Sequence, residues 1–158
     1  MKVFLSVGTH PRPFDRLLRE MDRVAGSRKD IEVFAQAGNC KYRPKNFAFE
    51  KFLNNKGFLE KIGWADVVVS HGGAGTLINA LRKEKKLVVV PRLERFNEHT
   101  NDHQLDLARA FHREGKAISV EMVCDLEKAL EMAKNFKPKT GSNRSKLVRA
   151  VKKFIEQA

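Results

Sequence analysis

Cysteine is scarce in this sequence, and long apolar runs are missing from it. The 158 residues include two cysteines, Cys40 and Cys124, whose spacing is typical neither of a disulfide framework nor of a metal site. We therefore expect two reduced thiols and no bound metal. The longest apolar runs, such as residues 87–90, fall far short of the roughly 20 residues that a membrane-spanning helix needs. The sequence thus predicts a chain that folds in the cytoplasm.

Tryptophan and tyrosine are also scarce, with one residue of each. The charge, by contrast, is large, because 31 lysines and arginines stand against 19 acidic residues and give a net charge of +12. Such a charge predicts anionic partners, which include nucleic acid, phosphorylated small molecules and an acidic membrane surface. No nucleic-acid-binding motif accompanies the charge, so we do not expect a nucleic-acid partner.

Strand-like and helix-like segments alternate along the chain. Short apolar runs typical of buried strands occupy residues 3–7, 31–35, 46–49, 67–69, 87–90 and 117–120. Apolar residues at helical spacing occupy residues 14–24, 58–63, 76–83, 102–112, 122–133 and 143–157. Because strand and helix alternate, the sequence predicts an α/β fold in which helices cover both faces of a parallel sheet. The length and a hydrophobic content of 42% fit a single domain over residues 1–158.

The stretch HGGAGT, residues 71–76, lies between a predicted strand and a predicted helix. The first amides of a helix have no partner within it, and together with the helix dipole they form an anion site. Glycine lets a large anion approach those amides because it has no Cβ. We therefore predict a phosphate or diphosphate cradle, although a tight turn built from glycine alone is the alternative. The residues of this cradle would be Gly72, Gly73, Ala74, Gly75 and Thr76.

Polar residues follow other predicted strands and should reach the same edge of the sheet. Asp102 and Gln104 offer groups that bond sugar hydroxyls, although they also fit a well-capped helix start. His99 and His103 lie four residues apart, but HTNDH lacks the glutamate of the zinc motif HExxH, so we expect no metal there. The remaining candidates at this edge are Gly8, Thr9, His10, Gln36 and His71. For these a structural role and a ligand role are both open, and His71 would either hold its loop or donate to a phosphate or sugar hydroxyl.

Three motifs, taken in order and at their spacing, resemble one family of enzymes. They are VGTHPRPFDRLL at residues 7–18, SHGGAGTLINAL at 70–81 and NEHTNDHQLDLA at 97–108. The chain resembles the C-terminal, donor-binding half of GT-B glycosyltransferases, in the group of the bacterial peptidoglycan UDP-GlcNAc transferase. It is most similar to the single-domain subunits of split transferases, of the dolichol-linked GlcNAc type and the bacterial exopolysaccharide type.

The resemblance implies a Rossmann-like half of a GT-B fold that binds a UDP-sugar as substrate, with no cofactor and no metal. It implies that residues 72–76 hold the diphosphate and that Asn79, at a position that is acidic in relatives, contacts the ribose. The triplet Asp-His-Gln at residues 102–104 would contact the donor sugar. The reaction would invert the anomeric centre by direct displacement, for which a base must take the acceptor proton. His10 is the local candidate for that base, and a partner is the other source.

The resemblance also implies a missing half, because GT-B enzymes react in a cleft between two domains. A membrane-anchored subunit would bind the acceptor, a lipid-linked glycan, and would recruit this chain to the inner face of the membrane. Residues 134–153 include eight basic and no acidic side chains. The basic charges of the helix expected at 143–157 would therefore attract an anionic leaflet or a lipid phosphate. The alternative is that this helix packs on the domain and its charges are solvated. The alternative functions are a non-catalytic scaffold that binds nucleotide sugars and a basic nucleic-acid-binding protein.

Overall fold

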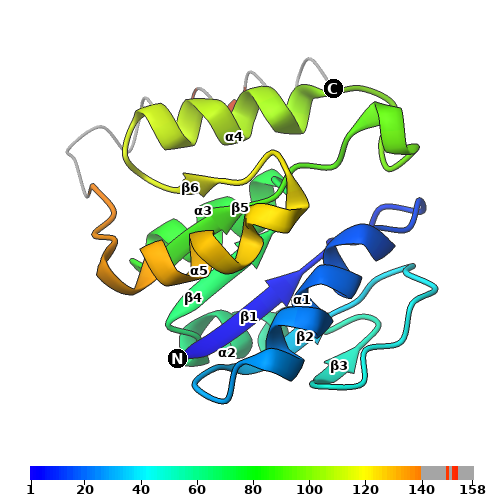
Figure 1. Ribbon diagram of the computed structural model, residues 1–158. Coiled ribbons are helices and arrows are strands. Elements are labelled where there is room, and N and C mark those ends of the chain that lie inside the picture. Colours follow the sequence, from blue (N-terminus) through cyan, green and yellow to red (C-terminus); the bar gives the residue numbers. More distant parts are fainter. Residues whose placement is uncertain (140–148, 150, 153–158) are drawn as a thin grey trace.

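The computed structural model describes residues 1–139, 149, 151 and 152. Six strands form one sheet in which every neighbouring pair is parallel (Figure 1). Their order is β3-β2-β1-β4-β5-β6, which is the strand order of the Rossmann fold. The predicted Rossmann-like parallel sheet is therefore confirmed. The strands are β1 (Lys2–Ser6), β2 (Glu32–Gln36), β3 (Ala48–Glu50), β4 (Val67–Ser70), β5 (Lys86–Val89) and β6 (Ile118–Ser119).

Helices follow the strands in turn, and most of them match the expected segments. Helix α2 begins before the predicted residue 58 because Asn54 caps it, with Oδ1 accepting a hydrogen bond from the Gly57 amide (2.8 Å). Most of the expected helix 143–157 lies outside the described residues, although Val151 is helical and buried. The bounds of the helices and 3₁₀ turns are α1 (Asp15–Ser27), α2 (Asn55–Trp64), α3 (Ala74–Arg82), η1 (Glu94–Phe96), α4 (His103–Arg113), η2 (Val123–Asp125) and α5 (Leu126–Asn135).

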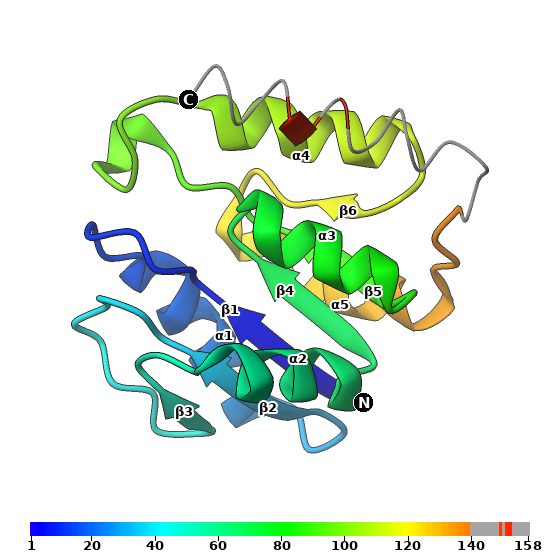
Figure 2. The same cartoon turned by 180° about the vertical axis from the view of Figure 1, so that it is seen from behind.

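The helices cover both faces of the sheet (Figures 1 and 2). Helices α1 and α5 pack on one face, and α2, α3 and α4 pack on the other. The alternation of side chains along β1 explains this division, since Val3 and Leu5 are buried with α1 and α5 whereas Phe4 is buried with α2, α3 and α4. Both faces of the sheet are thus covered by apolar packing. Polar chemistry is therefore left to the two sides of the sheet at which the strands begin and end.

Parallel pairing brings the carboxyl ends of all the strands to one side, which we call the carboxyl edge. The strand order reverses between β1 and β4, and these two strands pair directly from Val3–Val67 to Ser6–Ser70. Rossmann-like folds bind their ligands at such a reversal point. The loops after β1 and β4 begin there, and the loop after β5 lies next to them because β5 pairs with β4.

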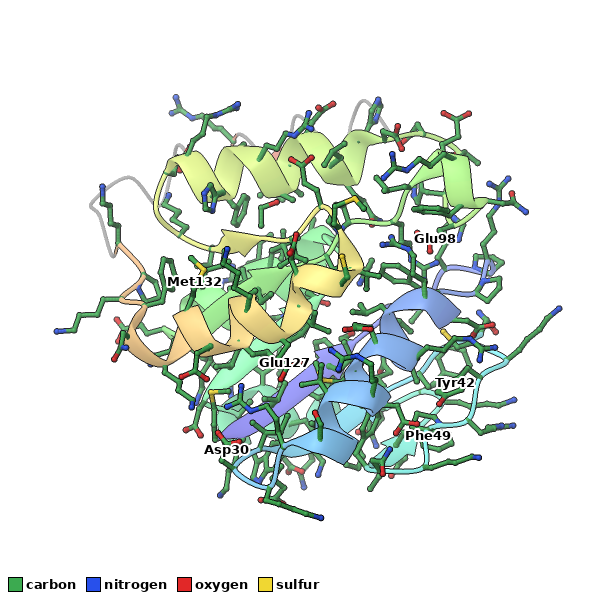
Figure 3. The ribbon with its side chains drawn as sticks, viewed as in Figure 1. Asp30, Tyr42, Phe49, Glu98, Glu127 and Met132 are labelled. Carbon is green, nitrogen blue, oxygen red and sulfur yellow. The ribbon has the colours of Figure 1, made fainter. Side chains whose placement is uncertain are left out.

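A buried carboxylate fixes the loop between β2 and β3. Asp22 of α1 is 3% exposed, and its two oxygens accept hydrogen bonds from Tyr42 Oη (2.6 Å) and from the amides of Lys45 (3.0 Å) and Asn46 (2.8 Å). Burial raises the pKa of Asp22, but the hydrogen bonds from Tyr42, Asn46 and Lys45 outweigh it, so the net pKa lies below its ordinary value. Figure 3 shows Tyr42 beside helix α1, which carries Asp22.

Tyr42→Phe is expected to lower the free energy of unfolding by about 1.5 kcal/mol, because it removes one hydrogen bond to a buried, charged acceptor. Urea denaturation at pH 7 measures the effect. The destabilisation should shrink as the pH falls through the pKa of Asp22, since a protonated carboxyl is a weaker acceptor. Equal stability of the variant and the wild type at pH 7 would show that the bond contributes nothing.

Two further expectations concern cysteine and the membrane. Cys40 is buried and Cys124 exposed, and both are free thiols, as the sequence predicts. The Cys40 sulfur accepts a hydrogen bond from the Phe14 amide (3.2 Å) and so helps to seat the start of α1. No helix in the described part of the chain is long and apolar enough to cross a bilayer.

Candidate functional site

The loops that carry the predicted site residues meet at the carboxyl edge. A Cβ added to Gly8, after β1, would lie 2.5 Å from Cε1 of His71, after β4. A Cβ added to Gly72 would lie 3.2 Å from the Cβ of Gln104, near the start of α4. The structure therefore brings together residues from three of the predicted loops, although they lie far apart in the sequence.

His71 is buried between two glycines. Its ring leaves no room for a Cβ on Gly8 or Gly73, and Gly8 also has a left-handed φ of +77°. Nδ1 of His71 lies 3.2 Å from the carbonyl oxygen of Ser6. A carbonyl only accepts, so Nδ1 carries the proton of the neutral ring and Nε2 is an acceptor. Burial and then the charge of Arg92 lower the pKa of His71 to about 3.

This geometry gives His71 a structural role, in which a neutral ring holds the loops after β1 and β4 together. Its predicted contact with a ligand stays a prediction. In the neutral tautomer found here, Nε2 would accept a hydrogen bond from a sugar hydroxyl and would not donate one to a phosphate.

The N-terminus of α3 is open. Within the described chain, the amides of residues 73–76 donate no hydrogen bond to any protein group. Gly75 is exposed, and within 4 Å a Cβ added to it would find no heavy atom of the described residues outside its own helix and adjacent residues. Packing therefore explains glycine at 72 and 73 but not at 75, where glycine costs a helix about 0.5–1 kcal/mol relative to alanine. Unpaired amides, the helix dipole and open space are the features with which helix N-termini bind anions, so this position suits the predicted cradle, which stays a prediction.

The predicted ribose- and sugar-binding residues lie at this helix and at the start of α4. Asn79 Nδ2 donates to the Gly75 carbonyl (2.9 Å), which leaves its Oδ1 available to a ligand. Asp102 Oδ1 and Gln104 Oε1 each accept a main-chain amide of the loop after β5, at 2.8 and 3.1 Å. Nδ1 of His103 is buried with no hydrogen-bond partner among the described residues. Each of the four side chains therefore keeps at least one polar atom without a hydrogen-bond partner among the described residues.

His10 stacks on His99 at the same edge, with ring centroids 4.9 Å apart. Burial and then the charge of Arg92 lower the pKa of both histidines below the ordinary value. His10 Nδ1 accepts a hydrogen bond from the Arg12 amide (3.1 Å), so the proton of the neutral ring is on Nε2. To act as a base through Nε2, His10 would first have to exchange tautomers. Its catalytic role stays a prediction.

Gln36 and Thr9 are two further residues of the predicted site, one buried and the other exposed. Gln36 is buried, and its Oε1 accepts the Leu53 amide (3.0 Å), so it holds the loop between β3 and α2. Thr9 is exposed beside His10. A ligand contact of either residue stays a prediction.

Sequence reasoning missed a buried ionic network beside these loops. Arg92 is 1% exposed and Glu98 is 4% exposed. The Glu98 carboxylate points toward α1 (Figure 3) and accepts two hydrogen bonds from Arg16, both of 2.9 Å. One signal was available in the sequence, because Arg92 stands between Pro91 and Leu93 directly after an apolar strand. A charge in such a place is either exposed or held by a network.

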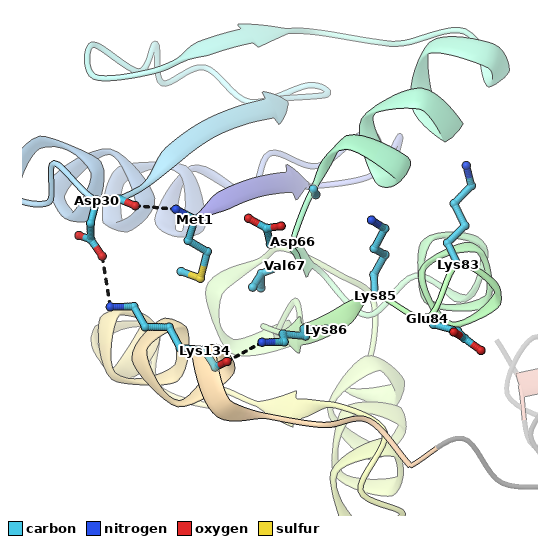
Figure 4. Close-up of a pocket in the computed structure, with 10 residues that line it drawn as sticks. Met1, Asp30, Asp66, Val67, Lys83, Glu84, Lys85, Lys86 and Lys134 are labelled. Carbon is cyan, nitrogen blue, oxygen red and sulfur yellow. Dashed lines mark hydrogen bonds and ion pairs between the residues drawn. The ribbon is translucent and has the colours of Figure 1, made fainter.

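A hollow of about 680 Å³ lies at the opposite, amino edge of the sheet (Figure 4). Its lysine amines are already engaged, since Lys86 Nζ and Lys85 Nζ donate to main-chain carbonyls and Lys134 Nζ pairs with Asp30 (3.2 Å). The hollow is separated from the glycine loop by the length of the strands. We therefore place the candidate site at the carboxyl edge.

Solved structures with a similar fold are glycosyltransferases. The glycosyltransferase of kitacinnamycin matches 99% of this chain with 39% of its own, at a TM-score of 0.65 and 19% identity. The calicheamicin glycosyltransferase CalG4 matches 99% of this chain with 38% of its own, at a TM-score of 0.60 and 16% identity. At these identities the likeness establishes the fold alone.

Curated relatives are similar in sequence. The human UDP-N-acetylglucosamine transferase subunit ALG13 is 36% identical over 125 residues, which cover 72% of this chain and 10% of that protein. ALG13 of Debaryomyces hansenii is 36% identical over 83 residues, which cover 52% of this chain and 38% of that protein. The matches thus span between a tenth and two fifths of the length of these relatives. The profile of the glycosyltransferase family 28 C-terminal domain matches residues 2–158, and the chain therefore belongs to that family.

Proposed function

We propose that this chain is the donor-binding part of a two-component inverting glycosyltransferase, which transfers a sugar from a UDP-sugar to a lipid-linked glycan. The observation that carries the proposal is the open N-terminus of α3, where the amides of residues 73–76 are unpaired and Gly75 borders open space. Diphosphates bind at helix ends of this kind. Two relatives are named UDP-N-acetylglucosamine transferase subunits, which supports a UDP-sugar as the donor.

In this proposal each part of the donor meets a different element. The diphosphate accepts hydrogen bonds from the amides of residues 73–76 and from the Thr76 hydroxyl. Asn79 Oδ1 accepts a hydrogen bond from a ribose hydroxyl, because its Nδ2 is engaged by Gly75. Residues 102–104 bond the hydroxyls of the sugar.

The chemistry is a single displacement. The acceptor oxygen forms a bond to C1 of the sugar while the bond from C1 to the diphosphate oxygen breaks, so the configuration at C1 inverts. UDP leaves with the bonding electrons, and the end of α3 stabilises its charge without a metal. The acceptor proton passes to a base. We favour a base from the partner, since His10 Nε2 carries a proton in the tautomer described above.

The partner in this proposal is a membrane-anchored subunit that binds the acceptor and closes the carboxyl edge. Both relatives are named as transferase subunits, which supports a partner of some kind. The chain itself would be cytoplasmic and would reach the inner face of the membrane through this partner. The net charge of +12 suits a site beside anionic lipid phosphates.

Isothermal titration with UDP, UDP-GlcNAc and uridine tests the donor site. We expect UDP and UDP-GlcNAc to bind clearly more tightly than uridine, because the diphosphate supplies charge-assisted hydrogen bonds at the end of α3. An absence of heat and of any thermal shift at millimolar UDP would contradict the proposal.

Transfer is tested by adding the partner, a polyprenyl-linked acceptor and a radiolabelled UDP-sugar. Label is expected in the lipid fraction only when both proteins are present. Binding of UDP without any transfer would leave a nucleotide-sugar-binding scaffold as the function.

Asn79→Ala is expected to weaken UDP binding about fivefold, because one hydrogen bond to a ribose hydroxyl contributes about 1 kcal/mol. The wild type should bind UDP more tightly than the deoxy analogue, 2′-deoxy-UDP or 3′-deoxy-UDP, that lacks the hydroxyl contacted by Asn79. The variant should bind UDP and that analogue equally tightly. The matched control is Asn55→Ala on α2, which should leave all three affinities unchanged. An undiminished preference in Asn79→Ala would remove the ribose contact.

A further inference from the structure

Arg92 ties the loop after β1 to the loop after β5. It follows β5 and is 1% exposed. Its guanidinium donates to the carbonyls of Val7 (2.7 Å) and Arg12 (2.8 Å), which stand at the two ends of the segment that carries Gly8, Thr9 and His10. It also donates to the carbonyl of Glu98 (3.2 Å) in its own loop. One side chain thus fixes the shape of the segment opposite the glycine loop.

Among the residues that the structure describes, Arg92 has no direct ion pair. Its hydrogen bonds in the described chain all go to carbonyl oxygens, and its Nε is buried without a partner. The nearby Glu98 carboxylate is committed to Arg16 and to the Leu93 amide. Burying a cation without a counter-ion is costly, even when its N–H groups donate to carbonyls. A positive charge kept in a buried place at this cost indicates that the charge itself has a function.

The field of this charge extends over the carboxyl edge. After burial, Arg92 is the largest cause that lowers the pKa of His10, His71 and His99, which come from three different loops. The other groups that face Arg92 are Arg12 from the same loop as His10, Cys40 after β2, and Glu98. With these histidines neutral, Arg92 is a buried fixed positive charge, beside the less buried Arg12, at the edge where the described residues leave the amides of residues 73–76 unpaired.

We propose that Arg92 is a positioning residue for a nucleoside diphosphate, which clamps the segment Val7–Arg12 and supplies a buried positive charge to the anion site at α3. This inference rests on the proposed function, and it adds a residue that acts on the ligand through the loop and through the field. It predicts a dependence on the ligand's charge that clamping alone would not produce.

The test compares Arg92→Met, Arg92→Lys and the matched control Arg95→Met, which removes an exposed arginine from η1 in the same loop. Arg92→Met should bind UDP about tenfold to thirtyfold more weakly while its affinity for uridine stays within about twofold. Arg92→Lys keeps the charge and should recover most of the UDP affinity. Arg95→Met should bind both ligands as the wild type does.

Histidine titration by NMR gives a second readout that a purely structural role would not move. The pKa values of His10 and His99 should rise in Arg92→Met, because a nearby positive charge is lost, and should remain low in Arg92→Lys. Equal losses of UDP and uridine affinity, or unchanged histidine titration in Arg92→Met, would overturn the inference. If Arg92→Met does not fold, Arg92→Gln takes its place with the same expectations. A wild type that does not bind UDP would instead contradict the proposed function, so the two failures are distinguishable.

Discussion

Gly75→Ala is expected to weaken UDP binding about tenfold to a hundredfold while leaving the protein at least as stable as the wild type. A charge-assisted hydrogen bond contributes about 1.5–3 kcal/mol, and a methyl group beside the unpaired amides of α3 would keep a phosphate from reaching them. Outside its own helix and adjacent residues, the new Cβ meets no atom of the described part of the chain within 4 Å, so we expect no strain. Alanine should also stabilise the helix by up to about 1 kcal/mol. Loss of binding with a gain in stability separates a ligand site from a packing site.

The matched control is Gly63→Ala on the exposed side of α2. There a Cβ would contact only the flexible end of Lys83, at 3.4 Å, and the position is far from the carboxyl edge. We expect the same small gain in the free energy of unfolding and no change in UDP affinity. Thermal melting and isothermal titration on both variants measure the two effects. Wild-type affinity for UDP in Gly75→Ala would show that the open space is not the diphosphate site.

Acidification is expected to destabilise the fold through His71. Its pKa is about 3 in the folded state and about 6.5 in the unfolded chain, so the unfolded chain takes up the proton first as the pH falls. Stability from the neutral ring is fully present above pH 6.5 and is lost progressively toward pH 3. Between pH 7 and pH 5 this single group should lower the free energy of unfolding by about 2 kcal/mol.

His71→Asn isolates this contribution. The asparagine amide can still donate to the Ser6 carbonyl, but it does not titrate, and the lost ring should destabilise the fold by about 1–3 kcal/mol at pH 7. His10 and His99 titrate in both proteins and cancel in the comparison. Urea denaturation at pH 7 and pH 5 should therefore show a fall that is about 2 kcal/mol smaller in the variant. The same fall in both proteins would place the acid sensitivity elsewhere.

Local patterns in the sequence were sufficient for the architecture, and they also indicated the edge of the sheet where the candidate site lies. Apolar runs of strand length alternate with apolar residues at helical spacing, and this alternation predicts a parallel sheet. The glycines of HGGAGT and the polar cluster after residue 90 follow strands, so they had to meet at the carboxyl edge. Boundaries moved where caps decide them, as Asn54 does for α2.

Other features depend on contacts between residues that are distant in the sequence. The burial of His71 between Gly8 and Gly73 requires β1 and β4 to be neighbours, which the glycine loop alone does not specify. The tautomer of His10 depends on one amide of its own loop, and that loop takes its shape from Arg92, 80 residues from Arg12.

By itself, therefore, the sequence determined that a strand ends at HGGAGT, that a helix starts within it and that polar groups gather at the same edge. The reason is that propensity and periodicity act over a few residues. Only the tertiary structure decided that Gly73 makes room for His71 and Gly72 for Gln104, whereas Gly75 borders open space. It also decided that a buried arginine lies behind the candidate site. Those facts follow from strand order and side-chain packing, which join segments that no local pattern connects.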